Sequence, residues 1–436
     1  MRRSSVLAVL FCVMPLAAYP FCQSDSIAGV CSADSLDFLS VKGVEACNAE
    51  DDEHATELWR MAAEGGHIEA QYDYALCLFN GTGVEQNYTE ALEWFKKAAA
   101  QGHTEAQFSI GYSCEYGLGM PASFEEAEKW YTMAACQDHS DAMLALGIIY
   151  YNGLTGDCNF PQAVEWFRKA SELGNAEAMS YLGRCYENGD GVEEDGYKAA
   201  VWYKKGAELG NVDCMYNLAY CYDWGIGIDY DAKKAIKLYR QAAEGGLDIA
   251  MYDVAMYYFA EKDSADAFTW LEAAAEQNYA DAQYMLGCCY HEGKFVEKDC
   301  EKAVLYFALA AGQEHADALC DLGYCYLVGK GVERNASVAL RWFLLSAKSG
   351  NMRAQHNLGV CSYEGIGIEQ NYEDAVKWFT LASDQGYADS QYYLGVCYNN
   401  GQGVKADRQK AIKLLRKAKD GGSKEAREAL VYLLSE

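Results

Sequence analysis

Alanine-centred segments with apolar residues at helical spacing recur along this chain at a nearly constant interval. We call the first alanine-like residue of each segment its anchor; successive anchors lie 36 residues apart, except for one interval of 32 residues that ends at Ala282. The anchors are Ala70, Ala106, Ala142, Ala178, Cys214, Ala250, Ala282, Ala318, Ala354, Ser390 and Ala426. A period of this length with two helical patterns per unit is typical of a helical solenoid. The register therefore predicts ten stacked helix hairpins.

Each unit contains two predicted helices of different character. In the first helix, apolar or small residues stand one, four, five and eight positions after the anchor (+1, +4, +5 and +8), on one helix face. A glycine at +5 in most units lets the second helix approach closely. A Gly-x-Gly turn such as 81–83 then precedes a second helix with an aromatic pair such as Trp94 and Phe95. Its alanine-rich end leads to a glycine or asparagine that ends the helix.

This pattern resembles the Sel-one-like repeat family, which is related to the tetratricopeptide repeats. The family pattern A-x-x-x-L-G-x-x-Y-x-x-G-x-G-V…A-x-x-W-[FY]-x-K-A-A is well preserved in residues 351–385, and the resemblance extends from about Ala55 to the C-terminus. It implies an all-α fold, a right-handed α–α superhelical solenoid of about ten hairpins. It also implies an adaptor or scaffold role in assembling protein complexes, without naming the partner.

The pattern divides the chain into four parts. Residues 1–22, with two arginines before an apolar stretch from Val6 to Ala18, read as a signal peptide, and an uncleaved anchor is the alternative. Residues 23–66 form a degenerate N-terminal cap, 67–422 the solenoid, and 423–436 a C-terminal capping helix. The unit 250–282 lacks the Gly-x-Gly turn, so its hairpin loop should be four residues shorter. No later segment has an apolar run long enough for a membrane span, so we expect an exported protein without a stable span after cleavage.

The chain is strongly acidic, with 36 Lys and Arg against 64 Asp and Glu and a formal net charge of -28. Such a charge repels phosphate backbones and anionic lipid headgroups, which argues against nucleic acid as a partner. It favours a basic protein or peptide partner, while solubility alone is the alternative explanation.

The sequence offers no residues for catalysis, cofactor binding or metal binding. The glycine pairs recur at the same place in nearly every unit without a following Gly-Lys-Ser or Gly-Lys-Thr, so they are turns and not phosphate loops. Neither His-Glu-x-x-His nor Cys-x-x-Cys occurs. Four histidines share the turn after the second helix: His67, His103, His139 and His315.

Eighteen cysteines would suit disulfides in an exported protein. Seven of them share position +7, where neighbouring helices would hold them about 8–10 Å apart, beyond the about 7 Å that a disulfide spans. This row is predicted to fill the core: Cys77, Cys185, Cys221, Cys289, Cys325, Cys361 and Cys397. The sequence also allows a disulfide from Cys300 to Cys288 or Cys289, and disulfides among the N-terminal cysteines.

A second functional hypothesis follows from the resemblance. Cysteine-rich members of the family staple each hairpin with a Cys-x7-Cys pair, and some are described as weak beta-lactam-binding or hydrolysing proteins. Only Cys214 and Cys221 come near that spacing, with six residues between them.

Positions +2 and +6 point away from the packing face and, by resemblance to tetratricopeptide repeats, would line a concave groove. Aromatic residues occupy these positions in many units: Tyr72, Phe108, Tyr216, Tyr252, Tyr284 and Tyr392 at +2, and Tyr112, Tyr220 and Tyr324 at +6. An aromatic ladder with an acidic rim suits an extended or helical peptide that carries basic residues. The alternative is that these tyrosines pack helix on helix along the stack. Acidic residues just before the anchors are explained by the helix dipole. We therefore expect an exported scaffold that binds protein through this groove.

Overall fold

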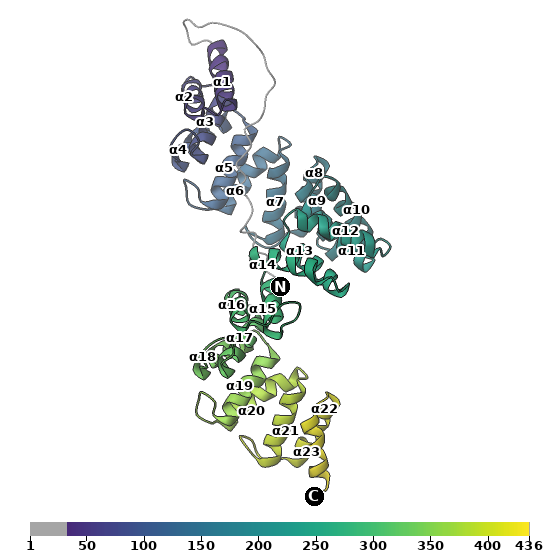
Figure 1. The fold of residues 1–436 in the computed structure, drawn as a ribbon. Coiled ribbons are helices and arrows are strands. Elements are labelled where there is room, and N and C mark those ends of the chain that lie inside the picture. The colour runs from purple at the N-terminus through teal and green to yellow at the C-terminus, as the bar shows by residue number, and fades with distance from the viewer. Residues whose placement is uncertain (1–32, 436) are drawn as a thin grey trace. The chain divides into compact units, whose positions relative to one another are not determined.

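The computed structural model describes residues 33–435, and within this range it contains α-helices joined by turns and no β-strand (Figure 1). Within each of the two compact units described next, successive helices pack against each other, which confirms the predicted all-α solenoid class. The chain divides into two compact units, Met1–Asp231 and Ala232–Glu436. The predicted signal peptide at 1–22 lies outside the described residues.

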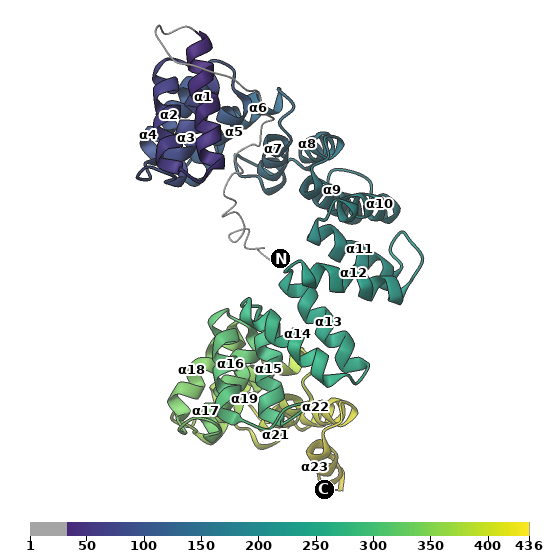
Figure 2. The same cartoon turned by 45° about the horizontal axis from the view of Figure 1, so that its top comes forward.

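The described part of the first unit, residues 33–231, contains eleven helices, labelled in Figures 1 and 2. They are α1 (Ala33–Asn48), α2 (Asp52–Glu64), α3 (Ile68–Asn80), α4 (Tyr88–Ala100), α5 (Thr104–Tyr116), α6 (Phe124–Ala135), α7 (Ser140–Asn152), α8 (Phe160–Glu172), α9 (Ala176–Asn188), α10 (Gly196–Glu208) and α11 (Val212–Trp224). The N-terminal segment, predicted to be a degenerate cap, forms the complete hairpin α1–α2.

Between residues 232 and 435, the second unit contains twelve helices. They are α12 (Ala232–Glu244), α13 (Asp248–Ala260), α14 (Ser264–Glu276), α15 (Ala280–Glu292), α16 (Cys300–Gly312), α17 (Ala316–Val328), α18 (Ala336–Lys348), α19 (Met352–Glu364), α20 (Tyr372–Asp384), α21 (Ala388–Asn400), α22 (Arg408–Asp420) and α23 (Lys424–Ser435). The last helix, predicted as the C-terminal cap, packs on α22.

Helix boundaries follow from capping residues at fixed places in the repeat. The side chain of His103 accepts a hydrogen bond from the N–H of Ala106 and starts α5, and Asn87 does the same for Glu90 at the start of α4. Most first helices end in a left-handed glycine, such as Gly81 with φ of 75°, whose N–H donates to a carbonyl of the last turn.

The glycine at +5 brings the two helices of a hairpin close together, as predicted. A Cβ placed on Gly183 would lie 2.3 Å from the ring of Tyr203, which is fully buried on α10. The second glycine of the turn makes a contact between repeats: a Cβ on Gly331, whose φ is 75°, would lie 2.0 Å from the carbonyl oxygen of Cys300. Both contacts require glycine for steric reasons.

The shortened unit has the predicted short loop. Residues 261–263 join α13 to α14, three residues where 81–87 provide seven between α3 and α4, a difference of four. The next loop also departs from the pattern, because Phe295 with φ of 69° takes the place of the second glycine. Its ring stacks on Phe259 of α13 at 4.4 Å between centroids.

Two positions of the first helix differ from the predicted packing pattern. Position +1 carries a buried glutamine in five repeats: Gln71, Gln107, Gln283, Gln355 and Gln391. Gln71 donates to the carbonyl of Ala63 and accepts from the side chain of Gln101, the residue that caps the end of α4, so its polar atoms are satisfied. Tyrosines at +8, such as Tyr186, are half-buried instead of fully buried.

Candidate functional site

The aromatic side chains at +2 pack along the stack of helices. Three of these rings stack on the imidazole that starts the next first helix, at centroid distances of 4.5 to 4.6 Å: Tyr72 on His103, Phe108 on His139 and Tyr284 on His315. Tyr72 also lies 5.8 Å from Phe95 in its own hairpin. Burial raises the pKa of the Tyr72 hydroxyl, and the charge of Glu105 raises it further.

The remaining aromatics at +2 are also half-buried. Tyr252 lies 5.5 Å from Tyr279, and Tyr392 lies 5.4 Å from Tyr393; Tyr216 is half-buried on α11. Where +2 is small, as at Ser180 and Cys320, the residue is buried. The contact of Tyr252, like those of Tyr72, Phe108 and Tyr284, joins the ring to the residue that caps the next first helix, whereas Tyr392 contacts its neighbour on the same helix.

Position +6 exposes more of its aromatic surface. Tyr220 is 38% exposed and Tyr324 is 44% exposed, whereas Tyr112 is half-buried beside Tyr116. The nine predicted aromatics divide between the two units. Five belong to the first unit, namely Tyr72, Phe108, Tyr112, Tyr216 and Tyr220; four belong to the second, namely Tyr252, Tyr284, Tyr324 and Tyr392.

Acidic residues form a column at the position just before the anchor (position -1). The column consists of Glu69, Glu105, Asp141, Glu177 and Asp213 in the first unit, and of Asp281, Asp317, Asp389 and Glu425 in the second. Burial raises the pKa of Glu177, and the charges of Asp213 and Asp141 raise it further, so successive members influence one another. Positions -1 and +6 are seven residues, or two turns, apart and therefore lie on one helix face.

Members of the column also bind the cap of the next repeat, a role that the helix dipole alone did not predict. Because Nδ1 of His103 accepts from the N–H of Ala106 at 3.1 Å, the proton of the neutral ring is on Nε2. That Nε2–H donates to Glu69 at 3.1 Å, and His315 contacts Asp281 at the same distance. Where asparagine is the cap, its amide donates instead: Asn175 to Asp141 at 2.8 Å and Asn351 to Asp317 at 2.9 Å.

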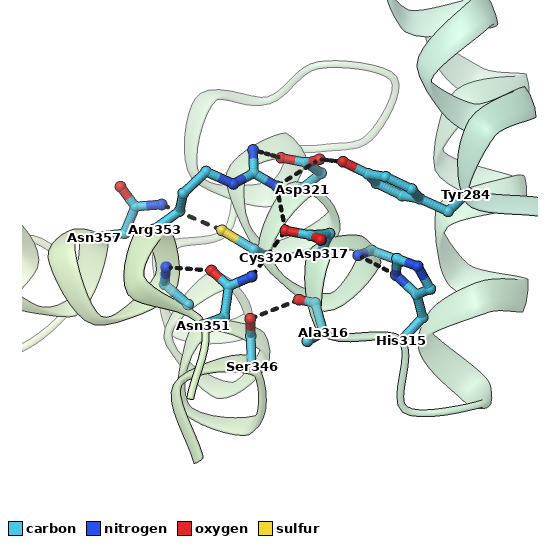
Figure 3. A network of polar contacts seen from close by, with 12 residues as sticks. Tyr284, His315, Ala316, Asp317, Cys320, Asp321, Ser346, Asn351, Arg353 and Asn357 are labelled. Atoms are coloured by element: carbon cyan, nitrogen blue, oxygen red, sulfur yellow. Dashed lines mark hydrogen bonds and ion pairs between the residues drawn. The ribbon is translucent and has the colours of Figure 1, made fainter. Parts of the chain in front are cut away.

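One repeat interrupts the acidic column with a cation. Arg353 of α19 occupies position -1 and reaches back to α17, where it donates to Asp317 at 3.1 Å and to Asp321 at 3.0 Å (Figure 3). The hydroxyl of Tyr284 on α15 donates to Asp321 at 2.9 Å. Burial raises the pKa of Tyr284, and the charge of Asp321 adds to the shift. The network joins three successive repeats and neutralises the column locally.

No disulfide joins any two of the described cysteines. All fifteen have free thiols, including Cys214 and Cys221, which come nearest to the Cys-x7-Cys spacing, and the open pair Cys288 and Cys300. The +7 row is buried, as predicted for core filling. Burial raises the pKa of Cys185 to about 12, so its thiol is protonated and unreactive at neutral pH. Within residues 33–435, no group of three His, Cys, Asp or Glu side chains could hold a metal ion.

Two hollows lie away from the predicted aromatics. One of about 530 Å³ is formed by the turns at 385–389 and 421–425, and one of about 390 Å³ lies beside Glu272, Tyr306 and Leu309. Neither is lined by a residue at +2 or +6 of the predicted set. Among the helices between residues 33 and 435, none is both long and apolar enough to cross a bilayer.

Comparison with known families identifies the repeat. The Sel1 repeat model matches residues 42–67, 68–103, 104–139, 140–175, 176–211, 212–247, 248–279, 280–315, 316–351, 353–387 and 388–423. These eleven segments exceed the ten predicted hairpins by one, which is the segment 42–67 that contains α2.

Two solved structures are similar over much of the chain. The first is c5321, a protective antigen present in uropathogenic Escherichia coli strains and displaying an SLR fold; it is 30% identical, with a TM-score of 0.69, over 92% of this chain and 89% of that chain. The second is a Sel1 repeat protein from Oxalobacter formigenes, 29% identical with a TM-score of 0.53, over 70% of this chain and 90% of that chain. The comparison with curated proteins gives no match.

Sel1 repeats generally mediate protein–protein interactions. Since the family model matches nearly all residues from 42 to 423, the chain belongs to the Sel1 repeat family.

Proposed function

We propose that this chain is an exported scaffold that holds a protein or peptide partner on the face formed by positions -1 and +6 of its first helices. The observation that carries the proposal is the column of carboxylates with exposed tyrosines two turns further along the same helices. Asp213 and Tyr220 form such a pair on α11, and Asp317 and Tyr324 form one on α17. Each unit carries a face of this kind of its own.

The chemistry of the face suits a basic segment. Carboxylates attract Lys and Arg side chains, and tyrosine offers a rigid apolar ring with a polar tip that can contact the rest of the segment. The half-buried rings at +2 hold successive repeats together under this proposal, since Tyr72 and Phe108 stack on the residues that cap the next first helices. We therefore assign contact with the partner to the exposed +6 tyrosines, and a supporting role to the aromatics at +2.

Export is the second part of the proposal. The order of charged, apolar and polar residues in 1–22 supports it. The relative from Escherichia coli is described as a protective antigen. Mass spectrometry of the mature chain from its own cells should give an N-terminus near residue 23. An intact Met1 in the exported fraction would contradict cleavage.

The binding face is tested by affinity capture with the full chain from its source cells, followed by mass spectrometry to identify the partner. Replacing Tyr112, Tyr220 and Tyr324 together with alanine should reduce capture of that partner at least tenfold, with unchanged circular dichroism. The matched control is Tyr257→Ala, which removes a 40% exposed tyrosine of α13 that is at neither +2 nor +6. Equal capture by wild type and the triple variant would refute the assignment.

A further inference from the structure

Trp224 is the one tryptophan that the repeat does not explain. Seven of the nine tryptophans share one position of the second helix: Trp94, Trp130, Trp166, Trp202, Trp270, Trp342 and Trp378. Trp59, one place later in its helix, is fully buried. Trp224 instead ends the first helix α11, and 68% of it is exposed. An indole this exposed contributes little to packing, and tryptophan is a frequent centre of binding surfaces.

Three exposed tyrosines accompany it in the same unit. Tyr220 lies one turn earlier on α11, with its ring centroid 6.0 Å from that of Trp224. Tyr230 in the following loop is 67% exposed, and Tyr197 at the start of α10 is 65% exposed. The loop rests on α10, since a Cβ on Gly227 would lie 2.3 Å from the backbone nitrogen of Tyr197. We name these four residues, Tyr197, Tyr220, Trp224 and Tyr230, the Trp224 surface.

Exposed carboxylates lie beside these rings in the sequence and in the fold. Asp223 and Asp229 flank Trp224 and its loop, and Glu193 and Glu194 precede α10, on which the loop rests; all four are exposed. Within the first unit, the nearby cation Lys198 is already paired, with its Nζ 3.1 Å from Asp195 and 5.4 Å from the ring centroid of Tyr186. The surface therefore combines aromatic faces with an excess of negative charge.

The protein uses indole rings elsewhere to hold lysine. Lys97, Lys169 and Lys205 each stand three residues after a tryptophan, and their ammonium groups lie 3.2, 4.3 and 4.0 Å from the indole centroids. Three residues after Trp224 the chain has Gly227, so α11 supplies no such lysine to this ring. The attraction of a cation to an indole face is strongest where carboxylates add to it.

We propose that the Trp224 surface binds a Lys or Arg side chain of an extended partner segment, with the cation on the Trp224 ring and the flanking carboxylates around it. An anionic ligand is disfavoured because Asp223, Asp229, Glu193 and Glu194 would repel it. A second copy of this chain is disfavoured by its net charge of -28. Apart from Tyr220, which the two surfaces share, this surface is distinct from the -1 and +6 face.

Binding of defined peptides to the full chain tests the proposal. Calorimetry at low salt would compare the peptides GKGKGKG, GRGRGRG and GQGQGQG. We expect the lysine and arginine peptides to bind at least tenfold more tightly than the glutamine peptide. Trp224→Ala should weaken both at least tenfold, Trp224→Phe should restore part of the loss, and Asp223→Asn with Asp229→Asn should reduce the salt dependence.

Two outcomes would overturn the proposal. The first is equal binding of the cationic peptides to wild type and to Trp224→Ala. The second is equal binding of all three peptides to wild type, because that result would indicate apolar contact without recognition of a cation. The variant Tyr324→Ala is the control, because it changes the -1 and +6 face in the second unit and leaves the Trp224 surface intact. Loss of peptide binding in Trp224→Ala but not in Tyr324→Ala separates the two surfaces.

Discussion

At the scale of single residues, the cap of each first helix does more than begin the helix. The imidazole of His103 accepts from Ala106, donates to Glu69 of the preceding repeat, and stacks on Tyr72. One side chain therefore links helix start, repeat junction and aromatic packing. Asparagine at the same position in other repeats retains the two hydrogen bonds and gives up the stacking.

Replacing His103 with alanine should cost about 1–2 kcal/mol of unfolding free energy, because the cap is lost and Glu69 loses its donor. His103→Asn should recover at least half of this loss, since Asn175 makes the equivalent bonds to Ala178 and Asp141. Urea unfolding followed by circular dichroism measures both. Equal losses in the two variants would mean that stacking on Tyr72 outweighs the cap.

The half-buried carboxyl of Asp73 gives stability a pH dependence whose sign follows from its raised pKa. Burial, with a contribution from Glu69, raises the pKa of Asp73 from 3.8 to about 7. Between these values the folded chain holds a proton that the unfolded chain has lost, so this group's contribution to stability falls as pH rises from about 4 to 7.

Asp73→Asn removes the titrating group and should flatten this fall. We expect the variant to melt at a higher temperature than wild type at pH 8 and at nearly the same temperature at pH 4. Thermal unfolding across this range is the measurement. A variant less stable than wild type at pH 8 would indicate that ionised Asp73 makes a favourable contact.

At the scale of helices, the close approach within a hairpin depends on glycine at +5. Gly183→Ala forces the ring of Tyr203 to move, because the added Cβ would lie 2.3 Å from it, and overpacking of this kind costs about 1–3 kcal/mol. The control is Gly312→Ala at the end of α16, where a Cβ meets no heavy atom within 4 Å. Unfolding in urea should show a loss for the first variant and none for the second.

Second helices differ from repeat to repeat at one exposed position. Leu309, Leu345 and Leu381 stand where other repeats place the lysines that cover tryptophan, and these leucines are 52, 47 and 49% exposed. Leu345→Lys would put an ammonium three residues after Trp342, so stability should stay within about 0.5 kcal/mol of wild type. Chemical unfolding would check this. A loss above about 2 kcal/mol would show that Leu345 has a packing role.

The sequence predicted a residue's role where its contacts lie within the same hairpin, and failed where they lie farther along the chain. The glycine at +5 and the cysteine row at +7 were predicted because their requirements are steric and arise within one hairpin. Gln71 was missed, since its bond to Gln101 joins residues 30 apart; glutamine recurring at both positions was the available signal. The exposure of Tyr72 could not be predicted, because it depends on the imidazole of the next repeat.

At the scale of the whole molecule, the repeat made the fold class predictable, since ten recurrences of one pattern leave little choice of architecture. The first hairpin was underestimated because α1 lacks the anchor pattern that marks the other first helices. Trp224 was not recognised as a possible contact, because the sequence pattern gave no sign that the end of α11 exposes its indole. Periodic patterns predict what repeats share, and binding surfaces arise where repeats differ.

Thiol labelling would test the packing along the chain. Cys136 and Cys158 are the exposed cysteines among those described, and ten others are buried. A maleimide should modify these two within minutes in the folded protein, and the buried row only after unfolding; peptide mass spectrometry identifies the sites. Labelling of Cys185 as fast as that of Cys136 would contradict the core-filling role of the row.

The bond between a cap and the carboxylate of the preceding repeat also makes the junctions interchangeable. His and Asn caps, like Asp and Glu acceptors, occur in several combinations at equivalent places. Deleting residues 140–175 would join His139 to Ala176 and leave Glu105 at the acceptor position of the new junction. A gene for such a chain can therefore gain or lose whole 36-residue units by recombination, and each new junction still pairs a cap with an acceptor carboxylate. The length of the protein can evolve in steps of one repeat while the contacts between the remaining repeats are conserved.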